Sequence, residues 1–285
     1  MAADGLHIVT GASGAIGQAL TRGLAAAGRH VVMACRNLEK AEPVRRRIAE
    51  ETGNPNVELL HLDLSSLQSI AGFALRVRED GRPVETLLNN AGVMNGRFAL
   101  TADGLEQTVG VNYAGPYALT RLLWETLAPE GRVVNTLSCT YRIGKVDDRL
   151  LDPDSERFSR FGAYGSSKLA LLLFTLELAR EFGESGRRAY AADPGVVDTD
   201  MIRMGRWFDP LADRLFRPLT KSPDRGAATA LALALRELPG PGPEAVYWSG
   251  GKARRIPARI CAHPRRRPLW EQTEQWLARS GTILA

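Results

Sequence analysis

Short apolar runs alternate with longer amphipathic segments along the chain, and this alternation restricts the possible folds more than any other feature of the sequence. The apolar runs lie at 6–10, 30–34, 57–62, 84–89, 132–138, 187–192 and 245–248, and the amphipathic segments at 15–28, 38–52, 66–80, 103–128, 162–183 and 221–237. Strands and helices that alternate in this way form right-handed βαβ units around a parallel sheet with helices on both faces. The sequence therefore predicts an α/β fold, a single doubly wound, three-layer αβα domain over 1–285 with a central, mostly parallel sheet of seven strands.

The first predicted strand runs directly into a glycine-rich turn, TGASGAIG over 10–17, which opens the first predicted helix. In a doubly wound sheet, ligands bind outside the carboxyl ends of the strands, where the strand order reverses. Glycines let the backbone turn tightly and approach a pyrophosphate, whose charge is favoured at a helix N-terminus. The turn therefore predicts nucleotide binding, with a plain glycine-rich βα turn as the alternative.

Arg36 follows the second predicted strand, at the place where a dinucleotide site often has an acid that binds the ribose 2′-hydroxyl. A guanidinium at that place can pair with a 2′-phosphate, which a carboxylate would repel. The sequence therefore predicts NADP(H) rather than NAD(H) as the cofactor. The alternative is an ordinary surface arginine at a strand end.

Tyr164 and Lys168, in the segment YGSSK, are spaced to lie on one face of a predicted helix. Such a pair is either an ordinary surface pair, with the phenol lying over the lysine stem, or an acid and its activator. A free phenol titrates at about pH 10, and an ammonium one helical turn away is expected to lower its pKa. The spacing alone does not decide between the two, so the surrounding motifs must.

Composition and charge exclude several other classes of protein. Hydrophobic residues at 44% and charged residues at 24% are typical of a soluble globular chain, and no apolar run is long enough to span a membrane. The N-terminal residues lead straight into the first strand without a signal peptide, so we expect a cytoplasmic protein. The net charge is +5, and the basic clusters at 254–255 and 265–267 lack interleaved aromatic residues, which favours a solvated basic face over nucleic-acid binding. The three cysteines and four histidines show no ligand spacing, so free thiols and no metal site are expected.

Seven motifs occur in a fixed order: TGASGAIG (10–17), HLDL (61–64), NNAG (89–92), VN (111–112), Ser138 after RVVNTL, YGSSK (164–168) and PGVVDT (194–199). Together they resemble the short-chain dehydrogenase/reductase family over nearly the whole chain. The segments LNNAGVM, SKLALLLFTLELAR and LWEQTEQWL are most similar to its retinol-dehydrogenase-like branch, which interconverts apolar carbonyls and alcohols. The resemblance implies a Rossmann fold and an oxidoreductase.

The resemblance also implies roles for individual residues. Tyr164 is expected to donate the proton to a substrate carbonyl, Ser138 to hydrogen-bond the same oxygen, and Lys168 to hold the nicotinamide ribose and lower the pKa of the phenol. Asn112 is implied to join a water chain from Lys168 to solvent. The cofactor-binding residues implied in addition to Tyr164 and Lys168 are Gly11, Ser13, Gly14, Ala15, Ile16, Gly17, Arg36, Asn37, Asp63, Leu64, Asn90, Ala91, Gly92, Pro194, Gly195, Val197 and Thr199. Structural alternatives remain: Asn112 bridging helices, Asp63 capping the next helix, and Ser138 satisfying a strand end.

The chain departs from the family pattern in four places. Ala15 replaces a glycine, and we expect its methyl group to crowd the phosphates slightly without preventing binding. Asp193 stands where the branch often has histidine, and either alters substrate preference or faces solvent. The segment 139–163 is longer than in compact members and is expected to form a surface excursion near the mouth of the site. The apolar residues of 199–221 fit either a lid over an apolar pocket or a core or interface segment.

The sequence thus predicts an NADP(H)-dependent enzyme that interconverts a ketone or aldehyde and its alcohol. Its substrate is expected to be a small apolar molecule, with a polyketide or other secondary-metabolite ketone, a terpenoid and a lipid aldehyde all open. The alanine- and arginine-rich composition suggests a bacterial source. Helices over 103–128 and 162–183 form the usual dimer surface of the family, which the longer interval before Tyr164 can obstruct, so a monomer and a homodimer both remain. A catalytically silent nucleotide sensor or scaffold of the same fold is the alternative function.

Overall fold

The computed structural model describes residues 5–197, 221–235 and 246–279, and in these ranges it is built around one twisted sheet. The strands are β1 (Leu6–Thr10), β2 (His30–Cys35), β3 (Val57–His61), β4 (Val84–Asn89), β5 (Leu127–Thr136), β6 (Arg188–Asp193), β7 (Tyr247–Ser249) and β8 (Lys252–Ala253). Their order across the sheet is β3-β2-β1-β4-β5-β6-β7-β8. The first seven run parallel, so the doubly wound prediction is confirmed.

The predicted strand count is wrong by one in the described residues, because β8 adds an eighth, antiparallel strand beside β7. Gly250 and Gly251 join the two strands with φ angles of 62° and 70°. A two-residue hairpin turn with both central φ angles positive matches the twist of the flanking strands, and glycine adopts it without strain. The pair of glycines after Ser249 therefore indicated a hairpin turn, and the prediction of seven strands did not take it into account.

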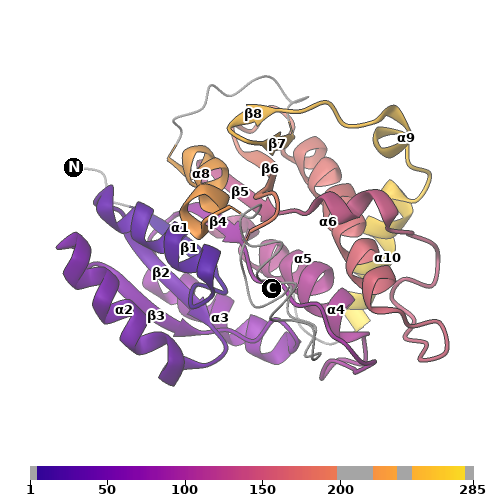
Figure 1. Ribbon diagram of the computed structural model, residues 1–285, viewed down its shortest axis with the longest axis horizontal. Helices are drawn as coiled ribbons and strands as arrows, with labels where there is room; N and C mark the ends of the chain where they lie inside the picture. Colours follow the sequence, from indigo (N-terminus) through magenta and orange to yellow (C-terminus); the bar gives the residue numbers. More distant parts are fainter. Residues whose placement is uncertain (1–4, 198–220, 236–245, 280–285) are drawn as a thin grey trace.

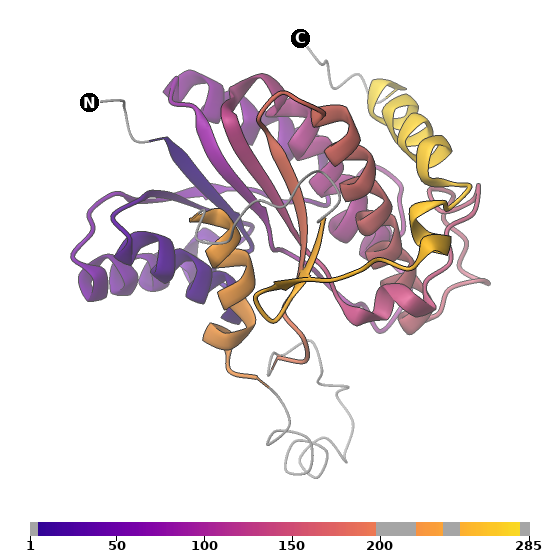
Figure 2. The same cartoon turned by 90° about the horizontal axis from the view of Figure 1, so that it is seen from above.

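Helices cover both faces of the sheet (Figures 1 and 2). The longer helices are α1 (Ala15–Ala26), α2 (Leu38–Thr52), α3 (Leu67–Asp80), α5 (Gly115–Leu122), α6 (Arg160–Phe182), α8 (Pro223–Ala234) and α10 (Arg266–Arg279). The shorter ones are α4 (Gln107–Val109), the π-helix η1 (Gly110–Ala114), the 3₁₀-helices η2 (Trp124–Thr126) and η3 (Cys139–Ile143), and α9 (Ala258–Cys261). None of the helices in the described ranges is long and apolar enough to cross a membrane.

Alternate residues of the strands pack into two separate hydrophobic cores, one on each face of the sheet. On β2, Val32 and Ala34 join the core that includes α3, α5 and α6, while Val31 and Met33 join the core that includes α1, α2 and α8. Side chains of successive strand residues point to opposite faces, so near-continuous apolar strands are what a sheet covered on both faces requires. The three-layer prediction is confirmed by this division.

One predicted helix, 103–128, is wrong at both ends. Its residues form α4, η1, α5 and η2 in succession, and strand β5 already begins at Leu127. The strand register shifts between Val84 and Thr86, where the partner on β5 moves from Leu127 to Arg132. The intervening segment contains Pro129 and Gly131, residues that mark irregular strand positions. The apolar spacing that predicted a helix to 128 therefore extends by chance into the first residues of β5, where the strand is irregular.

Helix α10 packs against α5 and α6 (Figures 1 and 2). The Trp270 ring lies 5.2 Å from the Tyr117 ring and 5.8 Å from the Phe174 ring. The first two residues of this helix are ion-paired: Arg266 lies 3.0 Å and Arg267 3.4 Å from carboxylate oxygens of the buried Glu177 on α6. The Arg267 side chain is nevertheless 48% exposed, so the basic residues at 265–267 are partly solvated and partly ion-paired.

Candidate active site

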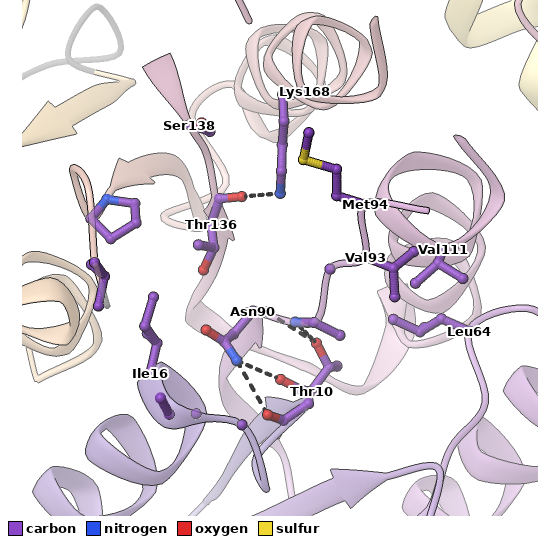
Figure 3. Close-up of a pocket in the computed structure, with 18 of the residues that line it drawn as sticks. Thr10, Ile16, Leu64, Asn90, Val93, Met94, Val111, Thr136, Ser138 and Lys168 are labelled. Carbon is purple, nitrogen blue, oxygen red and sulfur yellow. Dashed lines mark hydrogen bonds between the residues drawn. The ribbon is translucent and has the colours of Figure 1, made fainter. Parts of the chain in front are cut away.

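A cleft of about 930 Å³ opens at the carboxyl ends of β1, β2, β4, β5 and β6 (Figure 3). It lies where the strand order reverses, since β1 is flanked by β2 on one side and β4 on the other. The predicted site residues that line it are Gly11, Ser13, Gly14, Ala15, Ile16, Gly17, Arg36, Asn37, Asp63, Leu64, Asn90, Ala91, Gly92, Ser138, Tyr164, Lys168, Pro194, Gly195 and Val197. Residues from six motifs far apart in the sequence are thus brought to one cleft. Thr199 and the proposed lid over 199–220 lie outside the described residues.

The glycine-rich turn forms one wall of the cleft and requires glycine at two positions. Gly11 has a φ of +62°, and a Cβ there would lie 2.9 Å from the Cα of Ala91. A Cβ on Gly17 would lie 2.3 Å from the carbonyl oxygen of Gly11 and 2.7 Å from the Cα of Ala12. Neither position can hold a side chain without moving backbone. Helix α1 begins immediately after Gly14, so its N-terminal amides face the cleft.

Asn90 fastens the end of β4 to this turn. Its side-chain Nδ2 donates to the carbonyl oxygen of Thr10 at 3.0 Å, and its backbone N–H donates to the Thr10 hydroxyl at 3.0 Å (Figure 3). The backbone N–H of Ala91 donates to the same hydroxyl at 3.0 Å. Because the turn is held from the neighbouring strand, the backbone that would approach a phosphate is fixed in advance.

Two cations lie at the end of the cleft beyond β2. Arg36 follows the strand, and Lys40 on the first turn of α2 lines the same end. Asn37 caps α2, because its side chain accepts a 2.8 Å hydrogen bond from the backbone N–H of Lys40. Asp63 reaches this cleft too, and its Oδ1 accepts from the N–H and hydroxyl of Ser65 at 2.9 and 2.6 Å. The cap of α3 is Ser66, so the alternative role of Asp63 as that helix's cap is wrong.

Ser138, Tyr164 and Lys168 meet at the opposite end of the cleft. Ser138 follows β5 and begins η3, where its Oγ accepts from the Thr140 hydroxyl at 3.0 Å. Lys168 is 3% exposed, and its Nζ donates to the carbonyl oxygen of Thr136 at 2.8 Å (Figure 3). The same Nζ lies 5.7 Å from the centre of the Tyr164 ring. A phenol, a hydroxyl and an ammonium are therefore held together where the strands end.

The pKa of Tyr164 is raised above its ordinary value, whereas the sequence argument expected Lys168 to lower it. Burial has the largest effect and disfavours the phenolate, while a hydrogen bond with Ser138 acts in the opposite direction. Burial also lowers the pKa of Lys168 to about 8. Since its ammonium donates to Thr136 rather than to the phenol, its charge does not offset the desolvation of Tyr164. Tyr164 therefore keeps its proton at neutral pH.

Asn112 lies behind the cleft wall rather than in it. It is fully buried on η1, and its Oδ1 accepts from the N–H of Val93 at 2.7 Å. Its Nδ2 donates to the Val93 carbonyl at 2.9 Å and to the Ser167 hydroxyl at 3.1 Å. A Cβ on Gly92 would lie 3.5 Å from Asn112 Oδ1 and 3.6 Å from Lys168 Nζ. Asn112 thus bridges η1, the end of β4 and α6 beside Lys168, as its structural alternative predicts.

Asp193 ends β6 and does not face solvent, which corrects one of its two predicted readings. It is 4% exposed, and its Oδ1 accepts from the N–H of Gly195 at 2.8 Å. Its Oδ2 accepts from the hydroxyl of Tyr247 on β7 at 2.9 Å. The loop that begins with Pro194 and Gly195 lines the cleft. The carboxylate therefore supports that loop from behind.

The excursion 139–163 packs closely on α6. A Cβ on Gly144 would lie 2.2 Å from the carbonyl oxygen of Gly165, the glycine inside YGSSK, so the two backbones touch. The excursion returns to the cleft at Arg160 and Phe161, which line it. Phe161 is 54% exposed, and Val196 on the opposite loop is 56% exposed. The excursion thus lies at the cleft mouth, as its length and position predicted.

Several lining residues were not foreseen from the sequence. They are Thr10, Ala34, Cys35, Lys40, Leu62, Val93, Met94, Val111, Thr136, Leu137, Cys139, Thr140, Arg160, Phe161 and Val196. Thr10, Leu62, Val111 and Val196 lie inside the quoted motifs although no role was predicted for them. Most of the others directly precede or follow a motif, so their position next to a strand end was a usable signal. Lys40 and Phe161 had no such signal, because each reaches the cleft from a helix whose direction the sequence does not specify. No group of three histidine, cysteine, aspartate or glutamate side chains suited to a metal ion occurs among the described residues.

Comparison with known proteins gives a consistent match. Residues 6–206 match the family model of short chain dehydrogenase. Retinol dehydrogenase 12 from Mus musculus is 42% identical over 232 residues, which cover 81% of this chain and 73% of that protein. Polyprenol dehydrogenase from Homo sapiens is 39% identical over 254 residues, which cover 86% of this chain and 77% of that protein. A solved structure from Beutenbergia cavernae, with NADP bound at low occupancy, has a TM-score of 0.64 and 26% identity, covering 80% of this chain and 88% of that chain.

Proposed function

This chain belongs to the short chain dehydrogenase family, whose members are oxidoreductases that use a nicotinamide dinucleotide, and we propose that it interconverts an apolar carbonyl compound and its alcohol with NADP(H). The observation that carries the proposal is the meeting of Ser138, Tyr164 and Lys168 at one end of the cleft that the glycine-rich turn lines at the other. A nucleotide turn alone would fit many functions. A buried phenol beside a hydroxyl and an ammonium fits proton transfer to a carbonyl oxygen.

The cleft residues fit a dinucleotide. Gly11 and Gly17 let the turn fold tightly against Ala91 and against itself, whereas a Cβ on Gly14 would meet only the Gly11 carbonyl oxygen, at 3.4 Å. The backbone at the N-terminus of α1 is therefore open on the cleft side, which suits the close approach of a pyrophosphate. When bound, the cofactor supplies or accepts the hydride. Asn90 and Thr10 hold the turn that would bind the phosphates, and the loop from Pro194 to Val197, which also lines the cleft, would hold the nicotinamide.

In the reductive direction Tyr164 donates its phenolic proton to the carbonyl oxygen, and Ser138 donates a hydrogen bond to the same oxygen. Negative charge grows on that oxygen as hydride reaches the carbon, so a fixed donor there stabilises the transition state. Burial raises the pKa of Tyr164, so the phenol carries the proton that it would donate at neutral pH. Stabilisation of the phenolate by neighbouring groups is then required for the transfer. Lys168, anchored on Thr136, places a positive charge beside the phenolate that remains after the transfer.

NADP(H) rather than NAD(H) is supported by two cations at the far end of the cleft. Arg36 and Lys40 both line that end, and Arg36 occupies the position after β2 where an acid would select an unphosphorylated ribose. A 2′-phosphate beside a guanidinium gains charge-assisted hydrogen bonds. The solved relative with bound NADP is in accord with this proposal.

The proposed substrate is a long apolar alcohol or its aldehyde. Val93, Met94, Phe161 and Val196 give the catalytic end of the cleft an apolar lining, and the exposed Phe161 and Val196 extend it to the mouth. Two relatives carry the names of isoprenoid alcohols, retinol and polyprenol, and we extend that substrate class to this chain. A polyketide or other secondary-metabolite ketone could also contact this apolar lining, but neither of these two relatives is named for such a substrate.

The test is a panel of isoprenoid aldehydes, polyketide-like ketones and polar sugar ketones, followed by the absorbance of NADPH. We expect turnover of the apolar aldehydes, with the polar ketones inactive at the same concentration. Turnover of the polyketide-like ketones alone would replace the isoprenoid substrate. Tight NADPH binding without turnover of any compound would contradict the enzyme and favour the silent nucleotide-binding alternative.

Cofactor preference is tested separately with Arg36→Asp. This variant is expected to reverse the ratio of kcat/KM for NADPH to that for NADH, because the new carboxylate repels a 2′-phosphate and accepts from a 2′-hydroxyl. Arg76→Asp, which makes the same charge change on exposed α3, is the matched control and should leave the ratio unchanged. An equal preference in both variants and the parent would contradict the role of Arg36.

A further inference from the structure

Residues of α6 that line the cleft lie on one stripe of the helix and differ widely in exposure. Phe161, Tyr164 and Lys168 recur at the helical period, so their side chains project from the same face. Lys168 is 3% exposed, Tyr164 is 9% exposed and Phe161 is 54% exposed. The stripe therefore runs from the floor of the cleft, where Lys168 donates to Thr136 (Figure 3), past the phenol and out to the mouth.

The half-exposed ring of Phe161 is carried by a backbone that the surrounding contacts hold in place. Helix α6 begins beside it, and the cap is Ser159, whose hydroxyl oxygen accepts from the N–H of Gly162 at 3.1 Å. One residue earlier, the ring of Phe158 packs edge to face on that of Phe98 at 5.9 Å, which joins the excursion to the segment after β4. An apolar ring on a fixed backbone at a cleft mouth offers surface that a bound ligand can cover.

The excursion 139–163 is anchored at two further points. The N–H of Lys145 donates to the Ser166 hydroxyl on α6 at 3.0 Å. The carbonyl oxygen of Asp148 accepts from the side-chain amide of Gln272 on α10 at 2.8 Å. These contacts leave the start of α6 little freedom, so this wall of the mouth is formed before any substrate binds.

The loop after β6 contributes a second apolar side chain to the mouth. Val196 is exposed and lines the cleft. Its carbonyl oxygen accepts from the N–H of Lys221 at 2.8 Å, and the next residue, Val197, is buried and pairs with Lys221 in a parallel bridge. The exposed side chain thus stands on a backbone that hydrogen bonds hold, as Phe161 does.

The size of the cleft directs an extended substrate toward this mouth. The cleft volume of about 930 Å³ is near the upper end for a small-molecule site, about 300–1,000 Å³. In the proposed function a dinucleotide would occupy the part between the glycine-rich turn and Lys168. A compact carbonyl compound would fit beside Tyr164, whereas an extended chain would leave the cleft over Phe161 and Val196.

We propose that Phe161 is a specificity-determining residue of this active site, because its ring supports the apolar chain of the substrate between the carbonyl at Tyr164 and the mouth. The proposal rests on the proposed function and deepens it, since it assigns the direction of the substrate along α6. Binding of an extended chain removes the exposed ring from water, and the gain grows with the apolar area that is covered. A compact ketone does not reach this ring, so the site selects extended chains.

The first test measures how reduction depends on chain length. The ratio of kcat/KM for decanal to that for butanal is determined with NADPH in the parent and in variants. We expect Phe161→Ala to lower this ratio about tenfold, and Phe161→Leu, which keeps a large apolar side chain, to lower it less. Val196→Ala should lower it in the same direction by a smaller factor, because fewer apolar atoms are removed.

The loss in Phe161→Ala should appear in the KM for decanal rather than in its kcat. The contact lies away from the reacting carbon, so it is made equally in the ground state and the transition state. Leu75→Ala is the matched control, because Leu75 on α3 is 55% exposed and does not line the cleft. This variant should leave the ratio in place.

Two other roles of Phe161 predict different results. If the ring only fixes Tyr164 one helical turn away, Phe161→Ala lowers kcat for both aldehydes alike and leaves their ratio in place. If the ring instead contacts a second copy of the chain, the variant changes the sedimentation coefficient and again leaves the ratio in place. Either result overturns the proposal.

A binding measurement separates this proposal from the proposed function. Decanol is titrated calorimetrically into the protein saturated with NADPH, in which an alcohol has no hydride acceptor, and circular dichroism confirms that each variant is folded. We expect Phe161→Ala to raise the Kd about tenfold and Leu75→Ala to leave it unchanged. Equal Kd values in the parent and Phe161→Ala, or no binding to the parent, overturn the proposal. The expected rise in Kd without turnover of any aldehyde would support the role of Phe161 and contradict the proposed function alone.

Discussion

Tyr164 and Tyr117 are both buried tyrosines, on neighbouring helices, yet their surroundings differ in kind. Burial raises the pKa of each phenol. The Tyr117 hydroxyl donates to Glu274 on α10 at 2.6 Å, and its ring meets the Trp270 ring edge to face at 5.2 Å, so it belongs to a closed contact between helices. Tyr164 lines an open cleft, with Ser138 and Lys168 beside it. A strongly raised pKa therefore does not identify a catalytic group, whereas access to a cavity and the presence of a second donor do.

The same comparison bears on assembly. The family resemblance assigns a dimer surface to the helices predicted over 103–128 and 162–183, and α10 of the same chain contacts α5 and α6 in these segments. Arg265, just before this helix, lies 3.3 Å from Asp148 of the excursion, so the excursion and α10 are joined on that side. Tyr117 thus lies in an internal interface between helices, whereas Tyr164 lines the cleft.

The largest expected effect is the loss of kcat when the phenolic hydroxyl of Tyr164 is removed, compared with the same change at Tyr117. Tyr164→Phe should reduce kcat by about a thousandfold, because positioned proton donors contribute roughly 10²- to 10⁴-fold. Tyr117→Phe removes the same atom from the closed contact and should leave kcat unchanged. NADPH consumption with a substrate from the panel measures both, and the Kd for NADPH in Tyr164→Phe should match that of the parent. Comparable losses of kcat in the two variants would mean that Tyr164 acts through folding.

Trp270→Ala removes the ring of α10 that packs on Tyr117 and Phe174 in the closed contact between helices. Loss of a large ring packed on Tyr117 and Phe174 should lower the free energy of unfolding by about 3 kcal/mol. The kcat of the folded fraction should not change, since Trp270 does not line the cleft. Urea unfolding followed by circular dichroism gives the first quantity and activity below the transition gives the second. Gln275→Ala, an exposed change on the same helix, is the control.

Lys168→Met should separate stability from function. Burial lowers the Lys168 pKa to about 8, below the unfolded value, so the folded state carries a penalty that is complete below pH 8. The penalty diminishes as pH rises from the folded pKa toward the unfolded pKa, about 10.5, and vanishes above it, where both states are neutral. The variant should therefore lose turnover and yet be more stable than the parent at pH 7, by about 3 kcal/mol less the loss of one hydrogen bond to Thr136, about 1 kcal/mol. Unfolding at pH 7 and pH 10 should show the gain at the lower pH and little of it at the higher, whereas a gain independent of pH would contradict the burial cost.

The smallest effect concerns Tyr113, the second buried phenol of the closed contact. Its hydroxyl lies 2.6 Å from that of Thr273, which also donates to the Leu269 carbonyl at 2.7 Å. Tyr113→Phe leaves Thr273 with that partner, so the cost should be about 1 kcal/mol, the usual value of one hydrogen bond. Urea unfolding measures it. A cost as large as that of Trp270→Ala would show that hydroxyl bonding, rather than ring packing, holds α10.

Much of the cleft could be predicted because its residues follow strands. The carboxyl ends of parallel strands meet at one edge, so motifs after β1, β4, β5 and β6 converge whatever the loops do. Lys40 and Phe161 were missed because they come from helix starts, and the direction of a helix relative to the cleft depends on its packing. The eighth strand was missed although Gly250 and Gly251 signalled its hairpin.

The errors at the site share a cause. The sequence argument placed Lys168 one turn from Tyr164 and derived a lowered phenol pKa from that spacing alone. The structure directs the ammonium to Thr136 and buries the phenol, and desolvation prevails. Asp193 was read as either a substrate contact or a solvated acid, and its actual partner, Tyr247, lies 54 residues away in the chain.

By itself the sequence determined the alternation of strands and helices, the tight turn at Gly11 and the grouping of motifs at strand ends, because periodicity and backbone sterics act over a few residues. Tertiary structure alone decided that α10 covers Tyr117, that Asn112 bridges three elements behind the cleft, and that Asp193 is buried between the Gly195 turn and Tyr247. Hydrogen bonding and desolvation depend on which distant segments come together, and side-chain spacing along one helix carries no information about them.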